Sequence, residues 1–215
     1  MLKLLNKELR LCMHPTCLIF LAMAAMLLIP NYPYGVTFFY ATLAIFFVCL
    51  TGRENHDVAY TLSLPVKKGD AVKARYAFVV LYETAQILVC VPFVILRQTV
   101  LTDANVVGMD ANISLLCVGF LTFAVFNAVF FRVYYRDVNK VGTAFMWAAI
   151  AEFLFITLEE TLTHAVPFVR DVLDTADSAN ILPKLICLAA GIAIFAAVTL
   201  VSYRSSVKNF EKQDL

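Results

Sequence analysis

The chain has 215 residues, of which 61% are hydrophobic and 15% are charged. Soluble domains are roughly half apolar and a quarter charged, so the excess indicates that lipid forms part of the solvent. The formal net charge of +1 argues against a nucleic-acid-binding protein, because phosphate binding needs a concentrated basic face. The sequence has no Walker A loop, G-x-x-x-x-G-K-[ST], so we expect no ATP hydrolysis, and the length predicts one domain over residues 1–215.

Six apolar segments are predicted to form membrane-crossing helices. Crossing about 30 Å of hydrocarbon takes roughly 20 helical residues, and the segments that meet or approach this length are residues 16–29, 36–52, 76–96, 113–131, 142–162 and 185–203. The first is the weakest, because its length also suits a signal-peptide core or a re-entrant segment. A turn with prolines and interface aromatics follows it at 30–35, which favours a hairpin with 36–52. The expected fold class is all-α.

Lysine and arginine are distributed unequally between the connecting segments. Fourteen of the 17 lie at residues 3–10, 53–75, 132–140 and 204–212. The opposite set of connections keeps Arg97, Arg170 and Lys184, alongside Asp103, Asp110, Asp171, Asp174 and Asp177. Because basic residues mark the cytoplasmic face, we expect six spans with both termini in the cytoplasm. Residues 1–13 are predicted to form an interfacial helix, since their apolar and basic side chains fall on opposite faces.

The sequence contains no complete catalytic constellation at membrane depth. Glu159, Glu160 and His164 resemble part of an intramembrane protease motif, but His14 and His56, the only other histidines, lie at the opposite membrane surface. Neither a D-G-x-x-A-R run nor a G-x-S-x-G elbow is present. The six cysteines show no C-x-x-C spacing, so we interpret them as small packing residues rather than metal ligands.

A few polar side chains fall within the predicted spans, and they form the candidate translocation path. These residues are Glu83, Gln86, Asn127, Glu152 and Glu159. Carboxylates at membrane depth are unfavourable unless they face protein or water, so they are functional candidates by default. The alternative is that they hydrogen-bond neighbouring helices and hold the bundle together.

The connection at residues 53–75 is too long for a simple turn. Residues 54–63 are predicted to form a short amphipathic helix, which Leu64-Pro65 ends because the residue before proline disfavours helix. Gly69-Asp70 supplies a turn and an N-cap for the helix that enters the third span. The candidate coupling residues of this loop are Glu54, Asp57, Val58, Leu62, Leu64, Pro65, Lys67, Lys68 and Asp70.

At these residues the chain resembles a known family. The acidic stretch, Leu64-Pro65-Val66, the two following lysines and the helix into the third span resemble permease subunits of ABC type-2 exporters. Further features of the resemblance are Asn6-Lys7-Glu8-Leu9-Arg10, Ile29-Pro30-Asn31-Tyr32-Pro33 and Gly52-Arg53-Glu54-Asn55. The chain is most similar to the short bacterial group that includes exporters of amphipathic or antimicrobial peptides.

The resemblance implies a six-helix permease bundle of the type V exporter kind, in the bacterial plasma membrane. It implies pairing with a second copy or a paralogue, and docking of separate ATP-binding-cassette subunits that bind ATP and magnesium, with no cofactor in this chain. The loop at 53–75 would carry the coupling helix, and residues 163–183 would form short outer helices that cap the path.

Two other classes remain open from the sequence. A substrate-binding membrane subunit of an energy-coupling-factor importer also has about six helices, but it would not need a capped cytoplasmic loop. A lipid-processing enzyme is disfavoured by the missing catalytic constellation.

Overall fold

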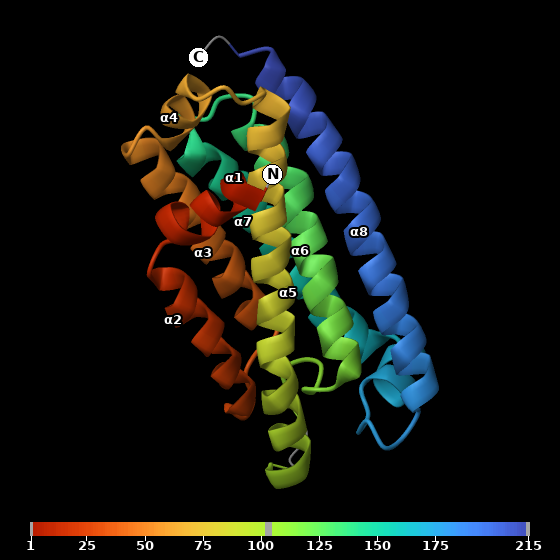
Figure 1. The fold of residues 1–215 in the computed structure, drawn as a ribbon. Helices are drawn as coiled ribbons and strands as arrows, with labels where there is room; N and C mark the ends of the chain where they lie inside the picture. Colours follow the sequence, from red (N-terminus) through yellow and green to blue (C-terminus); the bar gives the residue numbers. More distant parts are fainter. Residues whose placement is uncertain (1, 102–104, 214–215) are drawn as a thin grey trace.

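The computed structural model describes residues 2–101 and 105–213. Within these ranges the chain forms helices and no strand. Asp103 lies outside the described residues. Five helices are long and apolar enough to cross a membrane: α3 (Val36–Glu54), α5 (Lys68–Val100), α6 (Ile113–Tyr134), α7 (Val141–Ala165) and α8 (Ile181–Glu211). They run side by side in one elongated bundle (Figure 1). The chain is therefore a multi-pass, all-helical membrane protein.

The N-terminal segment forms a bent pair of helices. The predicted span 16–29 is built from α2 (Thr16–Ala22) and the 3₁₀ helix η2 (Met23–Leu28). Together they are about 22 Å long, at roughly 1.5 and 2.0 Å per residue, against about 30 Å of hydrocarbon. α1 (Leu2–Lys7) and the π-helix η1 (Glu8–Cys12) precede them at 84°, so they lie crosswise to α2 (Figure 1). Counted as one span, this pair raises the total from five to six.

The loop between α3 and α5 differs locally from the sequence prediction. Glu54 ends α3, and His56 adopts a left-handed conformation (φ 52°), so the short helix α4 (Asp57–Ser63) begins three residues later than predicted. α5 begins at Lys68, and no side chain caps it. Asp70 is thus not an N-cap: it lies in the first turn of α5, where its charge still interacts favourably with the helix dipole.

α6 forms the centre of the bundle. In an apolar stretch of 18 residues of α6, 72% of the residues are buried, compared with 28% in the corresponding stretch of α7 and 22% in that of α8. α6 packs along both of these helices. At Gly119 a Cβ atom would lie 2.6 Å from Phe38 of α3 and 2.7 Å from Ile87 of α5. Only a residue without a side chain lets the three helices approach so closely.

The two ends of the bundle are distinct. The α4 end holds α4, the α6–α7 loop and the end of α8, whereas the opposite end holds the π-helix η3 (Val169–Leu173) and the α7–α8 connection (Figure 1). Polar bonds fasten this connection to α6 and the loop before it. The Asp174 carboxylate accepts from the Asp110 backbone N–H at 2.6 Å, and Asp177 accepts from Ile113 N–H at 3.1 Å. We call the end of the bundle that holds α4 the α4 end, and the end that holds η3 the η3 end.

Replacing Gly119 by alanine should destabilise the protein by about 1–3 kcal/mol, because the added methyl overpacks the α3–α5–α6 contact. Gly142→Ala is the matched control. No neighbouring atom lies within 4 Å of its Cβ position, so the unfolding temperature should be unchanged or slightly higher. Thermal unfolding of the purified variants in one detergent measures both. Equal unfolding temperatures for the two variants would contradict the close approach at Gly119.

Candidate functional site at the α4 end

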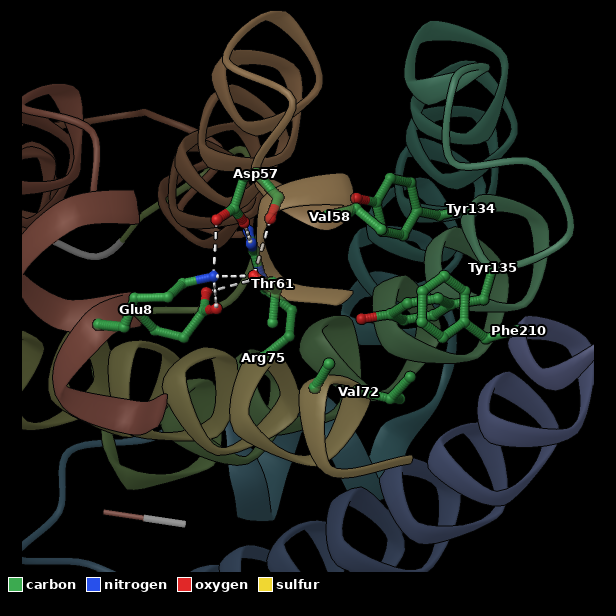
Figure 2. A pocket seen from close by; sticks show the side chains of 11 residues that line it. Glu8, Asp57, Val58, Thr61, Val72, Arg75, Tyr134, Tyr135 and Phe210 are labelled. Carbon is green, nitrogen blue, oxygen red and sulfur yellow. Dashed lines mark hydrogen bonds and ion pairs between the residues drawn. The ribbon is translucent and has the colours of Figure 1, made fainter. Parts of the chain in front are cut away.

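Four charged side chains from three parts of the chain meet at the start of α4. Figure 2 labels three of them, Glu8, Asp57 and Arg75. Arg75 of α5 lies between two carboxylates, with Nε 2.8 Å from Glu8 and Nη2 2.7 Å from Asp57. Lys7 Nζ lies 2.6 Å from the other oxygen of Asp57 and 3.4 Å from Glu8. The four side chains are at most 13% exposed. Two positive and two negative charges alternate, so this ion cluster is neutral as a unit.

Local structure explains how the cluster forms. Lys7 and Glu8 stand at the junction of α1 and η1, where the crosswise N-terminal segment passes α5. The left-handed turn at His56 redirects the chain so that Asp57 is the first residue of α4. Lys7 also donates a hydrogen bond to Thr61, one turn further along α4, at 2.6 Å. The cluster therefore joins α1, η1, α4 and α5.

The contacts within the cluster are unequal in kind. The Arg75 Nη2–Asp57 contact is an aligned hydrogen bond, whereas Glu8 Oε2 accepts none and meets Arg75 Nε only as an ion pair. Arg75 Nη1 has no hydrogen-bond partner among the described residues. A cavity of about 20 Å³ adjoins it, lined also by Tyr134, Tyr135 and Phe210, and that is room for one water.

Electrostatics keep Asp57 ionised. Burial by itself would raise the pKa of Asp57, but Arg75 and then Lys7 outweigh it, and the pKa lies below its ordinary value. Because the folded-state pKa is lowered, this contribution to stability is complete above the ordinary carboxyl pKa. It is lost as the pH falls through the lowered value. At neutral pH Asp57 therefore remains charged opposite Arg75 and Lys7.

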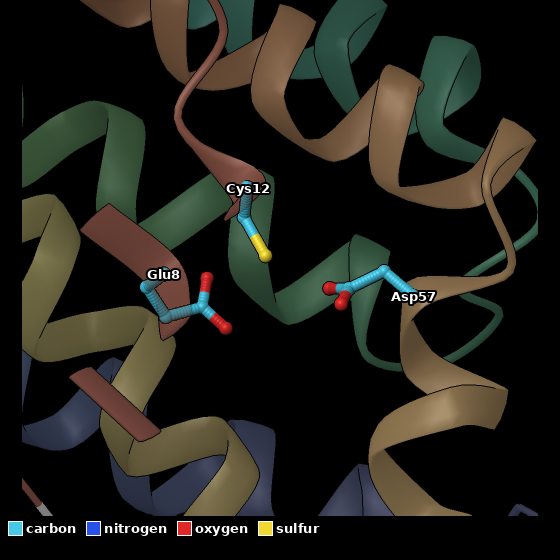
Figure 3. Close-up of side chains that lie close together, drawn as sticks. All are labelled: Glu8, Cys12 and Asp57. Carbon is cyan, nitrogen blue, oxygen red and sulfur yellow. The ribbon is translucent and has the colours of Figure 1, made fainter. Parts of the chain in front are cut away.

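Two carboxylates of the cluster and the neighbouring Cys12 resemble a metal site in their spacing alone. The ligand-type atoms of Glu8, Cys12 and Asp57 lie within 4.8 Å of one another (Figure 3). Burial raises the pKa of Cys12 to about 12, so its sulfur is a thiol and a poor ligand. Both carboxylates are already neutralised by Arg75 and Lys7. The protein's own cations thus take the place that a metal ion would need.

The structure divides the coupling residues predicted from the sequence into two groups. Asp57 belongs to the ion cluster, while Val58 and Leu62 are half-buried and pack against the core. Lys68 is also half-buried, and its ammonium donates to the backbone of Gln213. The remaining ones are exposed: Glu54, Leu64, Pro65, Lys67 and Asp70.

Four functional candidates at this site were missed by the sequence analysis as site residues. Lys7, Glu8 and Arg75 complete the cluster, and Tyr60 is the most exposed apolar side chain of α4, at 61%. The available signal was an adjacent acid–base pair on the N-terminal helix and an arginine at the entrance of a span. Neither indicates which opposite charge it meets.

The five candidate residues of the translocation path all face protein. Glu83, Gln86, Asn127 and Glu152 are fully buried, and Glu159 is 8% exposed. Asn127 of α6 donates to Glu83 of α5 at 3.0 Å and contacts Thr199 of α8 at 3.3 Å. Thr42 of α3 donates to Glu152 of α7 at 3.1 Å. These bonds link α6 to α5 and α8, and they link α3 to α7.

The fold and this site define a polytopic helical membrane protein in which a short connecting helix is tied by ion pairs to the bundle. The family model described as ABC-2 family transporter protein matches residues 3–211, so the chain belongs to that family. The family resemblance seen in the sequence is thereby confirmed. No curated protein and no solved structure matches the chain. The chain is a transport permease rather than an enzyme, and membrane proteins of this family typically work with ATP-binding subunits.

Replacing Arg75 by methionine should destabilise the protein by about 3–5 kcal/mol, because two buried carboxylates lose their shared cation. Arg53→Met is the control: Arg53 is 37% exposed and its ion pair to Glu54 is 3.7 Å long, so the cost should be at most about 1 kcal/mol. Adding Asp57→Asn to Arg75→Met should restore part of the loss. Thermal unfolding measures all three, and an Arg75 effect no larger than that of Arg53 would refute the cluster.

Proposed function

We propose that this chain is the membrane-spanning subunit of an ATP-binding-cassette exporter in the bacterial plasma membrane. It moves an amphipathic peptide out of the cell, with ATP and magnesium bound by separate subunits, and it pairs with a second copy or a paralogue. The observation that carries this function is the two-sided character of α4. The inner side of α4 is tied to the bundle by charge, whereas Tyr60 on its outer side and Leu64, directly after the helix, are exposed.

The outer side of α4 supports docking of an ATPase subunit. Tyr60 is 61% and Leu64 39% exposed, on a loop that also carries the exposed lysine Lys67. An exposed aromatic side chain of this kind can serve as the anchor of a protein contact. The α4 end is rich in lysine and arginine, so we place it in the cytoplasm, together with both termini. ATP is available on that side.

The inner side of α4 supports transmission of force. Any displacement of α4 acts through Asp57 on Arg75, and therefore on α5, and through Lys7 on α1. Separating a buried ion pair is strongly unfavourable, so the four elements move together rather than α4 alone. Closure of the ATPase pair would thus shift α5 and the N-terminal segment as one body and reorient the bundle.

The proposed path for the cargo runs along the polar residues of the spans. Glu83, Gln86, Asn127, Glu152 and Glu159 face inward in the closed bundle, and helix separation would place them along the opening. Carboxylates there would attract a cationic peptide weakly enough to let it move on.

Replacing Tyr60 or Leu64 by arginine should release the ATPase subunit while leaving the bundle folded, since both side chains point away from it. A hot-spot loss of at least about 2 kcal/mol, a factor of roughly 30 in affinity, is expected. Asn139→Arg is the control, because it adds the same charge to an exposed position at the same end outside α4. Co-purification from membranes measures retention. An ATPase held equally by all three variants would refute docking at α4.

Replacing Glu152 by glutamine should lower cargo-stimulated ATP hydrolysis by the reconstituted complex, with expression and subunit binding unchanged. The amide keeps the shape and accepts the same hydrogen bond from Thr42, so only the charge available to the cargo is removed. Basal hydrolysis without cargo is the internal control. Unchanged stimulation by a cationic amphipathic peptide would remove Glu152 from the path.

A further inference from the structure

The middle of the bundle contains buried hydrogen-bond acceptors that have no donor. Among the described residues, four such atoms belong to side chains of α5, α6 and α7 that are 0% exposed: Glu83 Oε1, Gln86 Oε1, Asn127 Oδ1 and Glu152 Oε1. The second oxygen of each carboxyl accepts a single bond, from Asn127 or from Thr42. The site is therefore rich in acceptors and short of protons.

No described lysine or arginine forms an ion pair with either carboxyl. Thr42 of α3 bonds to Glu152 and Asn127 of α6 bonds to Glu83, while Thr199 of α8 bonds to Asn127; none of the three titrates. The titratable groups within electrostatic range are the two carboxyls themselves and the phenol of Tyr76 on α5. Cys90, whose sulfur lies 3.9 Å from Gln86 Nε2, is a further titratable group on α5. Every one of these neighbours is neutral or negative.

Elementary electrostatics then fixes the form of the two acids. A carboxylate buried without a cation is strongly disfavoured, and two that interact disfavour each other further. A bound proton removes the charge and turns one acceptor oxygen into a donor. Gln86, one turn beyond Glu83 on α5, and Asn127, already bonded to Glu83, supply acceptors for it.

We propose that Glu83 and Glu152 form a proton-binding site inside the bundle, with a proton on each carboxyl in this conformation. Water that reaches the two groups when the surrounding helices separate takes both protons and leaves two carboxylates. Closing the bundle binds protons, and opening it releases them. The charge proposed above for the cargo path is then present only in the open state. The site does not depend on the proposed export function, because it rests on the closed bundle alone.

Infrared difference spectra of the full chain in lipid nanodiscs test this directly, without partner or cargo. Subtracting the Glu83→Gln spectrum from wild type at neutral pH should reveal a lost carboxylic-acid C=O band that shifts in D₂O. Glu152→Gln, measured independently, should lose a band of the same kind. Glu211→Gln, at an exposed position near the end of α8, should lose carboxylate bands instead.

The infrared spectra can also contradict the proposal. If the Glu83 and Glu152 variants lose carboxylate bands, as Glu211 does, both groups are ionised in the closed bundle and the proposal is wrong. A second readout covers a variant that fails to fold. Protons held only in the folded state make the unfolding temperature of wild type fall as the pH rises from neutral to alkaline. A wild-type unfolding temperature that stays constant or rises over that range would also overturn the proposal.

Discussion

The ion cluster of Lys7, Glu8, Asp57 and Arg75 holds together parts of the chain that apolar packing alone would leave loosely placed. α1 and α4 are short helices, of six and seven residues, and helices of this length are unstable in isolation. Each contributes a charge that only the others neutralise. Because each unpaired charge would be unfavourable at this depth, the N-terminal segment, α4 and the start of α5 adopt one arrangement together.

Buried carboxyl groups have different partners near the α4 end and in the middle of the bundle. Near the α4 end, the carboxylates of Glu8 and Asp57 are compensated by arginine and lysine. In the middle, Glu83 and Glu152 have only amide and hydroxyl partners. We propose that the first arrangement transmits displacement, since separating its members is unfavourable, and that the second responds to hydration, since its charge would depend on water. A transport cycle that moves α5 would act on both, because Arg75 and Glu83 lie on that helix.

Packing is just as uneven across the bundle. α6 is enclosed, while α7 and α8 present large apolar side chains such as Trp147, Leu154 and Leu182 outward. In water such a surface would aggregate, whereas in a membrane, lipid or another subunit covers it. The close contact at Gly119 and the polar bonds of Asn127 locate α6 against its neighbours, because lipid supplies no hydrophobic drive between helices.

Length, hydropathy and charge were enough to predict an all-helical membrane protein and its apolar segments, whereas the family was recognised from the resemblance of a few short motifs. These properties are local: twenty apolar residues form a spanning helix wherever they occur, because the backbone must satisfy its own hydrogen bonds in lipid. The short helix before Leu64-Pro65 was predicted for the same kind of reason. Its start was misplaced, because the left-handed conformation of His56 has no sequence signal as strong as glycine.

What only the tertiary structure decided is which charges meet. Lys7 and Asp57 are fifty residues apart in the sequence, and nothing in either segment specifies the other. The sequence placed Glu83 and Glu152 within spans, but not their partners, because hydrogen bonding between helices depends on rotation and depth that hydropathy does not encode. Periodicity determines which face of a helix is polar, whereas the packing of five or six helices determines what that face contacts.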